Sequence, residues 1–254
     1  MTDVVAIVPY RVDEAGVRRR NLEIVLRWLG EGGIPVVLAE HADAPDDSLA
    51  SSDTVTRLHI PAGGAPFNKS RACNAGFAST EAPILALVDA DTLVPMASLI
   101  AAIDAVRDGI DVVRPFGRLI ELDEEATRRI LEGAGLPEAE SGARDDSREG
   151  ERIPLGGGIV VLASSAYESV GGMDESFEGW GGEDDALSAA LGRAGLKCGI
   201  LEPSAALHLA HPRSMESRYG HAHYASNLER ARGGSAAAET ARAAPGRTSR
   251  DRLR

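Results

Sequence analysis

Short, uninterrupted apolar runs recur along the chain and alternate with segments of helical periodicity. Runs typical of buried strands lie at 4–9, 34–39, 55–60, 84–88, 111–115, 154–162 and 197–201. Apolar residues spaced as on one face of a helix predict helices at 18–29, 67–77, 99–106, 124–132, 164–170 and 185–194. This alternation is typical of a doubly wound sheet, so we expect a single α/β domain whose mostly parallel sheet is flanked by helices.

Composition narrows the classes of protein. The 254 residues, 43% of them hydrophobic, suffice for one large core. A net charge of -12 argues against binding nucleic acid or an anionic membrane surface. No apolar run approaches the roughly 20 residues that span a bilayer, and the first residues lack the pattern of a signal peptide. We therefore expect a cytoplasmic protein without a transmembrane segment, in which Cys73 and Cys198 are reduced, half-buried thiols.

Two stretches differ in composition from the rest. Residues 133–152 are rich in Gly, Ala, Ser, Glu, Arg and Asp and show no apolar periodicity, which predicts a flexible loop, either a lid or plain disorder. From residue 233 onward Gly, Ala, Ser and Arg dominate, so 233–254 is predicted to be a disordered tail. The expected domain therefore spans residues 1–232.

Residues 177–185 combine an indole, glycines and three consecutive carboxylates. Burying such charges is costly unless they face a ligand, a metal or water. Glu183, Asp184 and Asp185 repel one another, so the pKa of at least one should rise, as a general base near neutral pH requires. The same carboxylates also suit the first turn of a helix. The glycines would let the backbone approach a ligand and Trp180 offers a face for a sugar, which favours a ligand site.

The apolar run 84–88 leads directly into Asp89-Ala90-Asp91. Alternation along an extended chain would point both carboxylates the same way. Two carboxylates at the carboxyl end of a buried strand suit a hard divalent cation that bridges them to the phosphates of a nucleotide. The alternative is that one aspartate caps a turn.

Two further pairs carry candidate chemistry. Lys69 and Arg71, on an expected helix, can hold phosphates or can form a solvated face. His208 and His211 can share a metal where the backbone turns before Pro212, or can be a structural pair.

Four blocks, taken in order, resemble the β-1,4-galactosyltransferase family and its bacterial relatives, within the GT-A class of nucleotide-sugar glycosyltransferases. They are Val8-Pro9-Tyr10-Arg11, Phe67-Asn68-Lys69-x-Arg71-x-x-Asn74-x-Gly76-Phe77, Asp89-Ala90-Asp91, and Gly157-Gly158 followed by Gly179-Trp180-Gly181-Gly182-Glu183-Asp184-Asp185. Each short block is weak alone, and the last is the specific one. The resemblance implies a GT-A, Rossmann-like fold with a mixed, mostly parallel sheet. It also implies a hexosyl- or N-acetylhexosaminyltransferase that uses a nucleoside-diphosphate sugar, with UDP as the nucleotide.

The same resemblance implies residue roles. The nucleotide would contact Pro9, Tyr10, Arg11, Phe67, Lys69, Arg71, Asp89 and Ala90. A divalent cation, Mn²⁺ or Mg²⁺, would be held by Asp91, Asp89, His211 and His208. Asp184 would be the general base, with Glu183 beside it in the catalytic set. The acceptor or donor sugar would contact Trp180, Gly181, Gly182, Asp185, Gly157 and Gly158.

A carboxylate base opposite the leaving diphosphate implies a single in-line displacement with inversion. The sequence departs from the animal enzymes by lacking their membrane anchor, stem and disulfide cysteines, so cytoplasmic bacterial enzymes are the better comparison. Leu155 and Gly156 stand where the galactosyltransferases have an aromatic residue, so galactose does not follow as the donor. The acceptor, a saccharide, small molecule or peptide, is not indicated. A nucleotidyltransferase on a similar sheet and a non-catalytic nucleotide-sugar-binding protein are left as alternatives.

Overall fold

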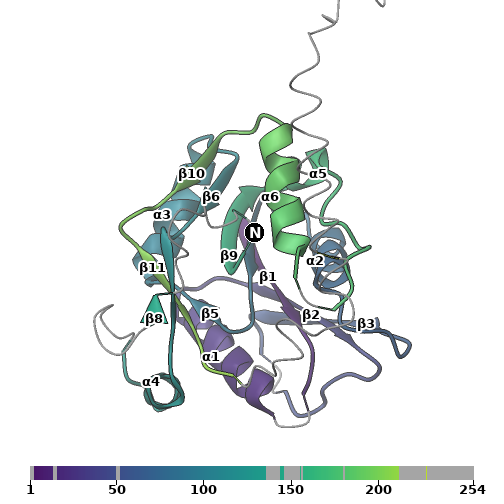
Figure 1. Ribbon diagram of the computed structural model, residues 1–254, viewed down its shortest axis with the longest axis vertical. Helices are drawn as coiled ribbons and strands as arrows, with labels where there is room; N and C mark the ends of the chain where they lie inside the picture. Colours follow the sequence, from purple (N-terminus) through teal and green to yellow (C-terminus); the bar gives the residue numbers. More distant parts are fainter. Residues whose placement is uncertain are drawn as a thin grey trace, which may run out of the picture.

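The computed structural model describes residues 3–13, 16–49, 52–135, 144–145, 155, 157–179, 181–211 and 227. In these residues the predicted α/β fold is confirmed, because helices cover a central, mostly parallel sheet (Figure 1). The expected domain span of 1–232 stays a prediction, and the segment 233–254 lies outside the described residues.

The strands of the central sheet follow the order β10-β6-β9-β4-β1-β2-β3 among the described residues. They are β1 (Val4–Tyr10), β2 (Val36–Ala42), β3 (Val55–Pro61), β4 (Ile84–Val88), β6 (Val112–Arg114), β9 (Ile159–Ala163) and β10 (Cys198–Ile200). Neighbouring strands are parallel except at β9, which runs antiparallel to both β4 and β6. The other strands therefore end at one common edge of the sheet.

Alternate residues of each buried strand feed two cores, as a period of two requires. In β1, Val4, Ala6 and Val8 belong to one core, whereas Val5 and Ile7 belong to the other. The first core is covered by α1 (Val17–Glu31) and α3 (Met96–Arg107). The second is covered by α2 (Lys69–Ala78), α5 (Ser164–Ser169) and α6 (Glu183–Arg193). Burial on both faces explains why these strands are continuously apolar.

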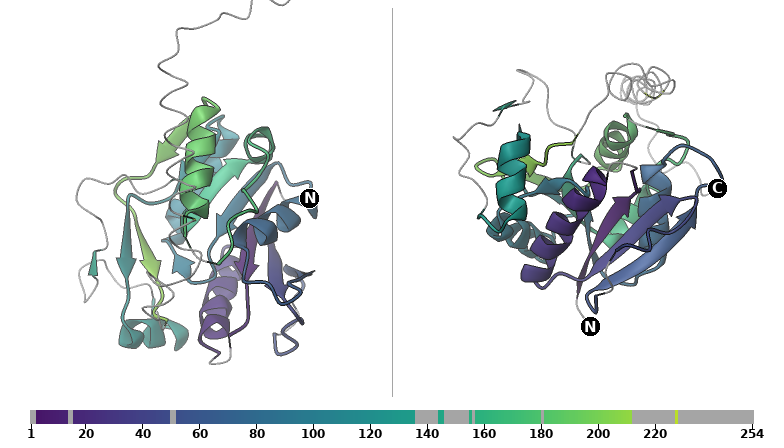
Figure 2. Two further views of the ribbon diagram at one scale, coloured as in Figure 1. Left: turned by 45° about the vertical axis from the view of Figure 1, so that its right-hand side comes forward. Right: turned by 90° about the horizontal axis from the view of Figure 1, so that it is seen from below.

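A second, smaller sheet lies beside the central one and was not predicted from the sequence (Figure 2). Its strands, in spatial order, are β5 (Thr92–Leu93), β11 (Ala205–His208), β7 (Arg118–Glu121) and β8 (Arg144–Asp145). Strand β11 pairs antiparallel to β5 and parallel to β7, with His208 opposite Thr92. The helix α4 (Glu124–Leu131) follows β7 in the chain. This sheet brings the first histidine next to the end of β4.

Several expectations need correction. Strand β8 falls within the segment 133–152, which was expected to be a loop throughout, and 136–143 and 146–152 lie outside the described residues. The two cysteines are free, as predicted, but neither is half-buried: Cys73 is buried and Cys198 is exposed.

No helix in the described part of the chain combines the length and apolar character that crossing a membrane requires.

Candidate functional site

The chain turns sharply after β4, and this turn separates the two aspartates of the Asp89-Ala90-Asp91 motif. The carbonyl of Asp89 accepts a hydrogen bond from the Thr92 N–H at 3.2 Å, and the N–H of Asp89 donates to Gly158 O at 2.8 Å. Period-two alternation therefore stops at Val88. Asp89 pairs with the Lys69 ammonium at 2.7 Å, whereas Asp91 faces two histidines. Asp89 lies outside the cluster of potential metal ligands that contains Asp91, so its expected part in holding a cation stays a prediction.

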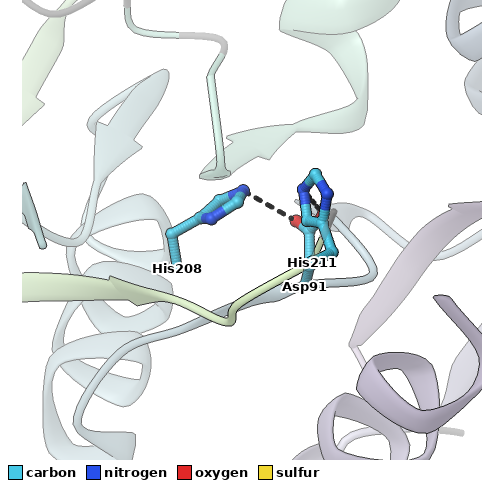
Figure 3. Close-up of side chains that lie close together, drawn as sticks. All are labelled: Asp91, His208 and His211. Atoms are coloured by element: carbon cyan, nitrogen blue, oxygen red, sulfur yellow. Dashed lines mark ion pairs between the residues drawn. The ribbon is translucent and has the colours of Figure 1, made fainter. Parts of the chain in front are cut away.

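Asp91, His208 and His211 form that cluster (Figure 3). The Nε2 atom of His208 lies 3.6 Å from one Asp91 oxygen, and Nε2 of His211 lies 3.4 Å from the other. One potential ligand atom from each residue falls within 4.8 Å of the others. Two ligands about 2.1 Å from one ion lie roughly 3 to 4 Å apart, so small inward movements suffice. A carboxylate with two imidazoles suits Mn²⁺ and, less well, Mg²⁺.

Backbone hydrogen bonds bring this cluster together from distant parts of the chain. The N–H of Leu209 donates to the carbonyl of Asp91 at 2.8 Å, and the N–H of Leu122 donates to the carbonyl of His208 at 2.9 Å. Burial raises the pKa of Asp91, but the charges of His208, His211, Arg18 and Lys69 together outweigh burial, so the net pKa lies below its usual value. Asp91 is therefore ionised, as a cation ligand must be.

Lys69 connects the Asp89 turn to the acidic cluster. Its ammonium lies 2.9 and 3.0 Å from the two oxygens of Asp184, in addition to its contact with Asp89. The Lys69 side chain is 13% exposed and that of Asp184 is 23% exposed. Lys69 is thus the counter-ion of two carboxylates and not part of a solvated face, and its role as a phosphate ligand stays a prediction. Arg71 is exposed, and its role stays a prediction.

The acidic cluster shows the expected rise in pKa. Burial raises the pKa of Asp184 well above its usual value, Glu183 and Asp89 add to the rise, and Lys69 opposes it. Burial also raises the pKa of Glu183. For Lys69, burial would lower the pKa, but the carboxylates of Asp184, Asp89 and Glu183 outweigh burial, so the pKa lies well above its usual value. The ammonium therefore stays charged, and proton exchange at this site belongs to the carboxylates.

The helix-start interpretation of the cluster is also correct, because Glu183, Asp184 and Asp185 form the first turn of α6. Gly182 precedes them with φ of 91°, and a Cβ there would meet Phe177 and Asn227, each at 2.9 Å. Neither conformation nor space allows a side chain at this point.

The glycines that were expected to contact the sugars lie in different surroundings from one another. A Cβ at Gly157 would lie 3.7 Å from a carboxylate oxygen of Asp184, so the backbone there borders the acidic cluster. A Cβ at Gly158, whose φ is 72°, would contact Phe116 at 3.3 Å. Gly181 has φ of 95°. Trp180 lies outside the described residues, so its expected contact with a sugar stays a prediction.

Two asparagines of the block Phe67 to Phe77 build the scaffold of the acidic cluster. Asn68 accepts from the Arg71 N–H, which starts α2 at Lys69, and donates to Glu175 O at 2.7 Å. Asn74 donates to Met173 O and accepts from Met173 N–H, both at 2.9 Å. Because these bonds tie α2 to the loop before α6, the block positions Lys69 opposite Asp184.

Of the residues at the end of β1 that were expected to contact the nucleotide, Pro9 and Tyr10 are buried and Arg11 is exposed. Tyr10 is 1% exposed and donates its hydroxyl to Asp46 at 3.0 Å, so its side chain packs inward. Pro9 is also buried. Arg11 lies open, with its guanidinium 5.6 Å from the centre of the Phe67 ring. The expected contact of this pair with a nucleotide stays a prediction.

Two further residues that bear on the site, Arg18 and Asn227, were not predicted from the sequence. The positive charge of Arg18, in the first turn of α1, contributes to lowering the pKa of both Arg11 and Asp91. The signal available was the run of three arginines at 18–20. Asn227 donates to Glu178 O at 2.9 Å and supports the loop before α6, and no sequence pattern marks it.

Comparisons with known proteins bear on this site. Residues 151–212 match the family model described as the N-terminal domain of galactosyltransferase. The resemblance to the galactosyltransferases is confirmed over this segment. It contains the Gly157-Gly158 block, the acidic cluster and both histidines, whereas the blocks before residue 151 lie outside it. No curated protein sequence matches the chain.

Among solved structures, two similar ones are of Drosophila beta1,4-galactosyltransferase 7. One is the catalytic domain in complex with xylobiose, at 15% identity and a TM-score of 0.48, covering 78% of this chain and 63% of that one. The other is a mutant in complex with manganese, UDP-Gal and xylobiose, at 15% identity and a TM-score of 0.48, covering 78% of this chain and 64% of that one. The chain thus spans less than two thirds of the length of either structure.

Proposed function

We propose that the chain is a metal-dependent, inverting glycosyltransferase that moves a hexosyl or N-acetylhexosaminyl group from a UDP-sugar to an acceptor hydroxyl. The observation that carries the proposal is the adjacency of two chemical groups at the carboxyl edge of the sheet. One is the Asp91, His208 and His211 cluster, and the other is Asp184 with Lys69. Asp89, in contact with Lys69 and two residues from Asp91, joins them. The match of residues 151–212 to the galactosyltransferase model supports the same chemistry.

In the proposed reaction, Asp184 accepts the proton of the acceptor hydroxyl while the acceptor oxygen bonds to the anomeric carbon. The bond from that carbon to the nucleoside diphosphate breaks on the opposite face, so configuration inverts. Arg11 and Arg18 supply positive charge on the nucleotide side. A Mn²⁺ or Mg²⁺ ion held by Asp91, His208 and His211 would neutralise charge that develops on the leaving diphosphate.

One observation favours the alternative of a non-catalytic nucleotide-sugar-binding protein. The Lys69 ammonium contacts both oxygens of Asp184, and this contact opposes the rise in the pKa of Asp184 that burial produces. Catalysis by Asp184 therefore requires the acceptor to displace Lys69 from at least one oxygen. The other alternative is a nucleotidyltransferase. Such an enzyme would not need a general base for an acceptor next to the sugar.

A screen of nucleotide sugars tests the proposal. Each sugar nucleotide is titrated into the protein with Mn²⁺, with Mg²⁺ and with a chelator, and slow hydrolysis is followed in parallel. We expect one UDP-sugar to bind in a cation-dependent manner and to be hydrolysed. Acceptor trials with that donor then separate a transferase from a binding protein. Cation-independent binding, or binding without hydrolysis or transfer, would reject the proposal.

The histidine cluster gives a direct prediction. Replacing His211 with alanine should weaken Mn²⁺ binding by at least about tenfold, because one potential ligand is lost. His59 provides the matched control, since its Nε2 atom lies 2.9 Å from Ala42 O and it belongs to the edge strand β3. Calorimetric Mn²⁺ titrations of His211→Ala and His59→Ala decide the matter, and coinciding curves would make His211 structural.

The contacts of Lys69 predict a stability effect. Lys69→Met should lower the free energy of unfolding by about 2–3 kcal/mol, because Asp89 and Asp184 lose their counter-ion in a partly buried site. The loss should shrink in an Asp184→Asn background. Urea unfolding measures both, with Arg128→Met as the control. Arg128 pairs with Glu125 and Glu132 on the exposed side of α4, where solvent screens the pairs, so a much smaller loss is expected. Equal losses for the two variants would contradict the assigned pairing.

A further inference from the structure

The peptide groups of Ala210, which lies between the two histidines, are held by side chains from two helices. The N–H of Ala210 donates to the hydroxyl of Thr127, in α4, at 2.8 Å. Its carbonyl accepts from the amide of Asn21 at 3.1 Å and from the guanidinium of Arg20 at 2.8 Å, both in α1. Donor and acceptor of the same residue are thus both satisfied by side chains.

Two of the polar side chains that hold the Ala210 peptide groups are buried. Thr127 is 0% exposed and Asn21 is 1% exposed, on helix faces that otherwise bury Ile130 in α4 and Leu22 in α1. A polar residue at a core-facing position of a helix lowers stability unless its hydrogen bonds are made. Apolar residues would pack the same faces without that constraint. Polar groups at such positions point to a requirement other than packing.

The consequence falls on His211, which directly follows Ala210. His208 is already fixed by its place in β11 and by the Leu122 N–H. His211 comes after the strand ends, so the position of its imidazole follows from the orientation of the Ala210 peptide. Groups that orient a ligand without touching the ion change metal affinity by about 10- to 100-fold.

We propose that Thr127 and Asn21 are positioning residues that hold His211 opposite Asp91, so that the cluster can bind a divalent cation. The inference rests on the proposed function, because it assigns these residues to the cation site of that function. Arg20 takes part in the same contact but also pairs with Glu124 at 2.9 Å and donates to the side-chain oxygen of Asn21 at 3.2 Å, so its replacement would change three interactions.

Mn²⁺ binding to the full chain tests the inference, measured by calorimetry and by the shift in Tm that Mn²⁺ produces. Thr127→Val keeps the shape of the side chain and removes the hydroxyl, and we expect Mn²⁺ affinity to fall by about 10- to 100-fold. Thr127→Ser restores the hydroxyl and should restore affinity to within about threefold of the unaltered protein. Asn21→Leu is an independent variant with the same expected loss, should Thr127→Val fail to fold.

Ser164→Ala serves as the control for stability alone. The Ser164 hydroxyl donates to Ala82 O at 2.5 Å, beside the amino end of β4 and away from the cation cluster. This variant should lower Tm without changing Mn²⁺ affinity. Unchanged affinity in both Thr127→Val and Asn21→Leu, with a Tm loss like that of Ser164→Ala, overturns the inference while the proposed function stands. An unaltered protein that binds neither Mn²⁺ nor Mg²⁺ overturns both.

Discussion

Replacing Asp91 with alanine is expected to remove most of the cation-dependent binding of a nucleoside diphosphate. Asp91 is the carboxylate of the cluster, and both histidines approach it. Without it, two imidazoles remain, which hold Mn²⁺ or Mg²⁺ poorly. A diphosphate would then lose the ion that neutralises it. We expect a loss of about 3 kcal/mol or more in UDP binding, which exceeds a hundredfold in affinity.

Calorimetry of UDP binding with Mn²⁺ and with a chelator measures this effect. Asp104→Ala is the control, because Asp104 is an exposed carboxylate of α3 that pairs with Arg107. It should bind UDP as the unaltered protein does. Asp89→Ala adds a second comparison: since Asp89 contacts Lys69, its loss should reduce affinity for Mn²⁺ alone far less than the loss of Asp91. The cation-site assignment fails if UDP binds equally well with Mn²⁺ and with chelator.

The parts of the fold that were predictable share one property, burial on both faces. The apolar run at 84–88 coincides with β4, and the run at 4–9 differs from β1 by one residue at its end. A strand of this kind must be apolar throughout, so its composition alone reveals it. The strands β5, β7 and β11 belong to the small side sheet, where the strands are short and partly polar. Their pairing depends on long-range contacts that local patterns do not encode.

The candidate site was predictable as a set of residues and not as a set of contacts. Asp91, His208 and His211 were expected together and are found together. The partner of Lys69 was missed because Lys69 and Asp184 lie 115 residues apart and only the folded chain joins them. The separation of Asp89 from Asp91 was missed for a local reason. Alternation assumes an extended strand, and the chain turns immediately after Val88.

The sequence also did not predict the role of Asn68 and Asn74, in the block from Phe67 to Phe77. The side chains of Asn68 and Asn74 make several hydrogen bonds to the loop before α6. Sequence resemblance marks such residues as part of a functional block, yet it cannot separate those that contact a ligand from those that hold the loop. Only the positions of the hydrogen-bond partners make that distinction.

The proposed mechanism makes the prediction with the largest expected effect on turnover. Asp184→Asn keeps the shape of the side chain but removes the proton acceptor, so the transfer rate should fall by about 10²- to 10⁴-fold. Binding of the UDP-sugar should change little, because the cation cluster is a separate group of residues. Steady-state kinetics and donor titrations on the same preparations measure the two quantities.

The pH dependence of the rate adds a second test of Asp184. Its pKa is raised, chiefly by burial, and the base works only when ionised. The rate should therefore fall as pH decreases through this pKa, at a higher pH than for an ordinary aspartate, and Asp184→Asn should lose that acid limb. A carboxylate that merely starts α6 predicts otherwise. Its loss would cost roughly 1 kcal/mol of stability and would leave the shape of the pH profile unchanged. Near-normal transfer by Asp184→Asn, or a product with retained anomeric configuration, would therefore exclude Asp184 as an inverting base.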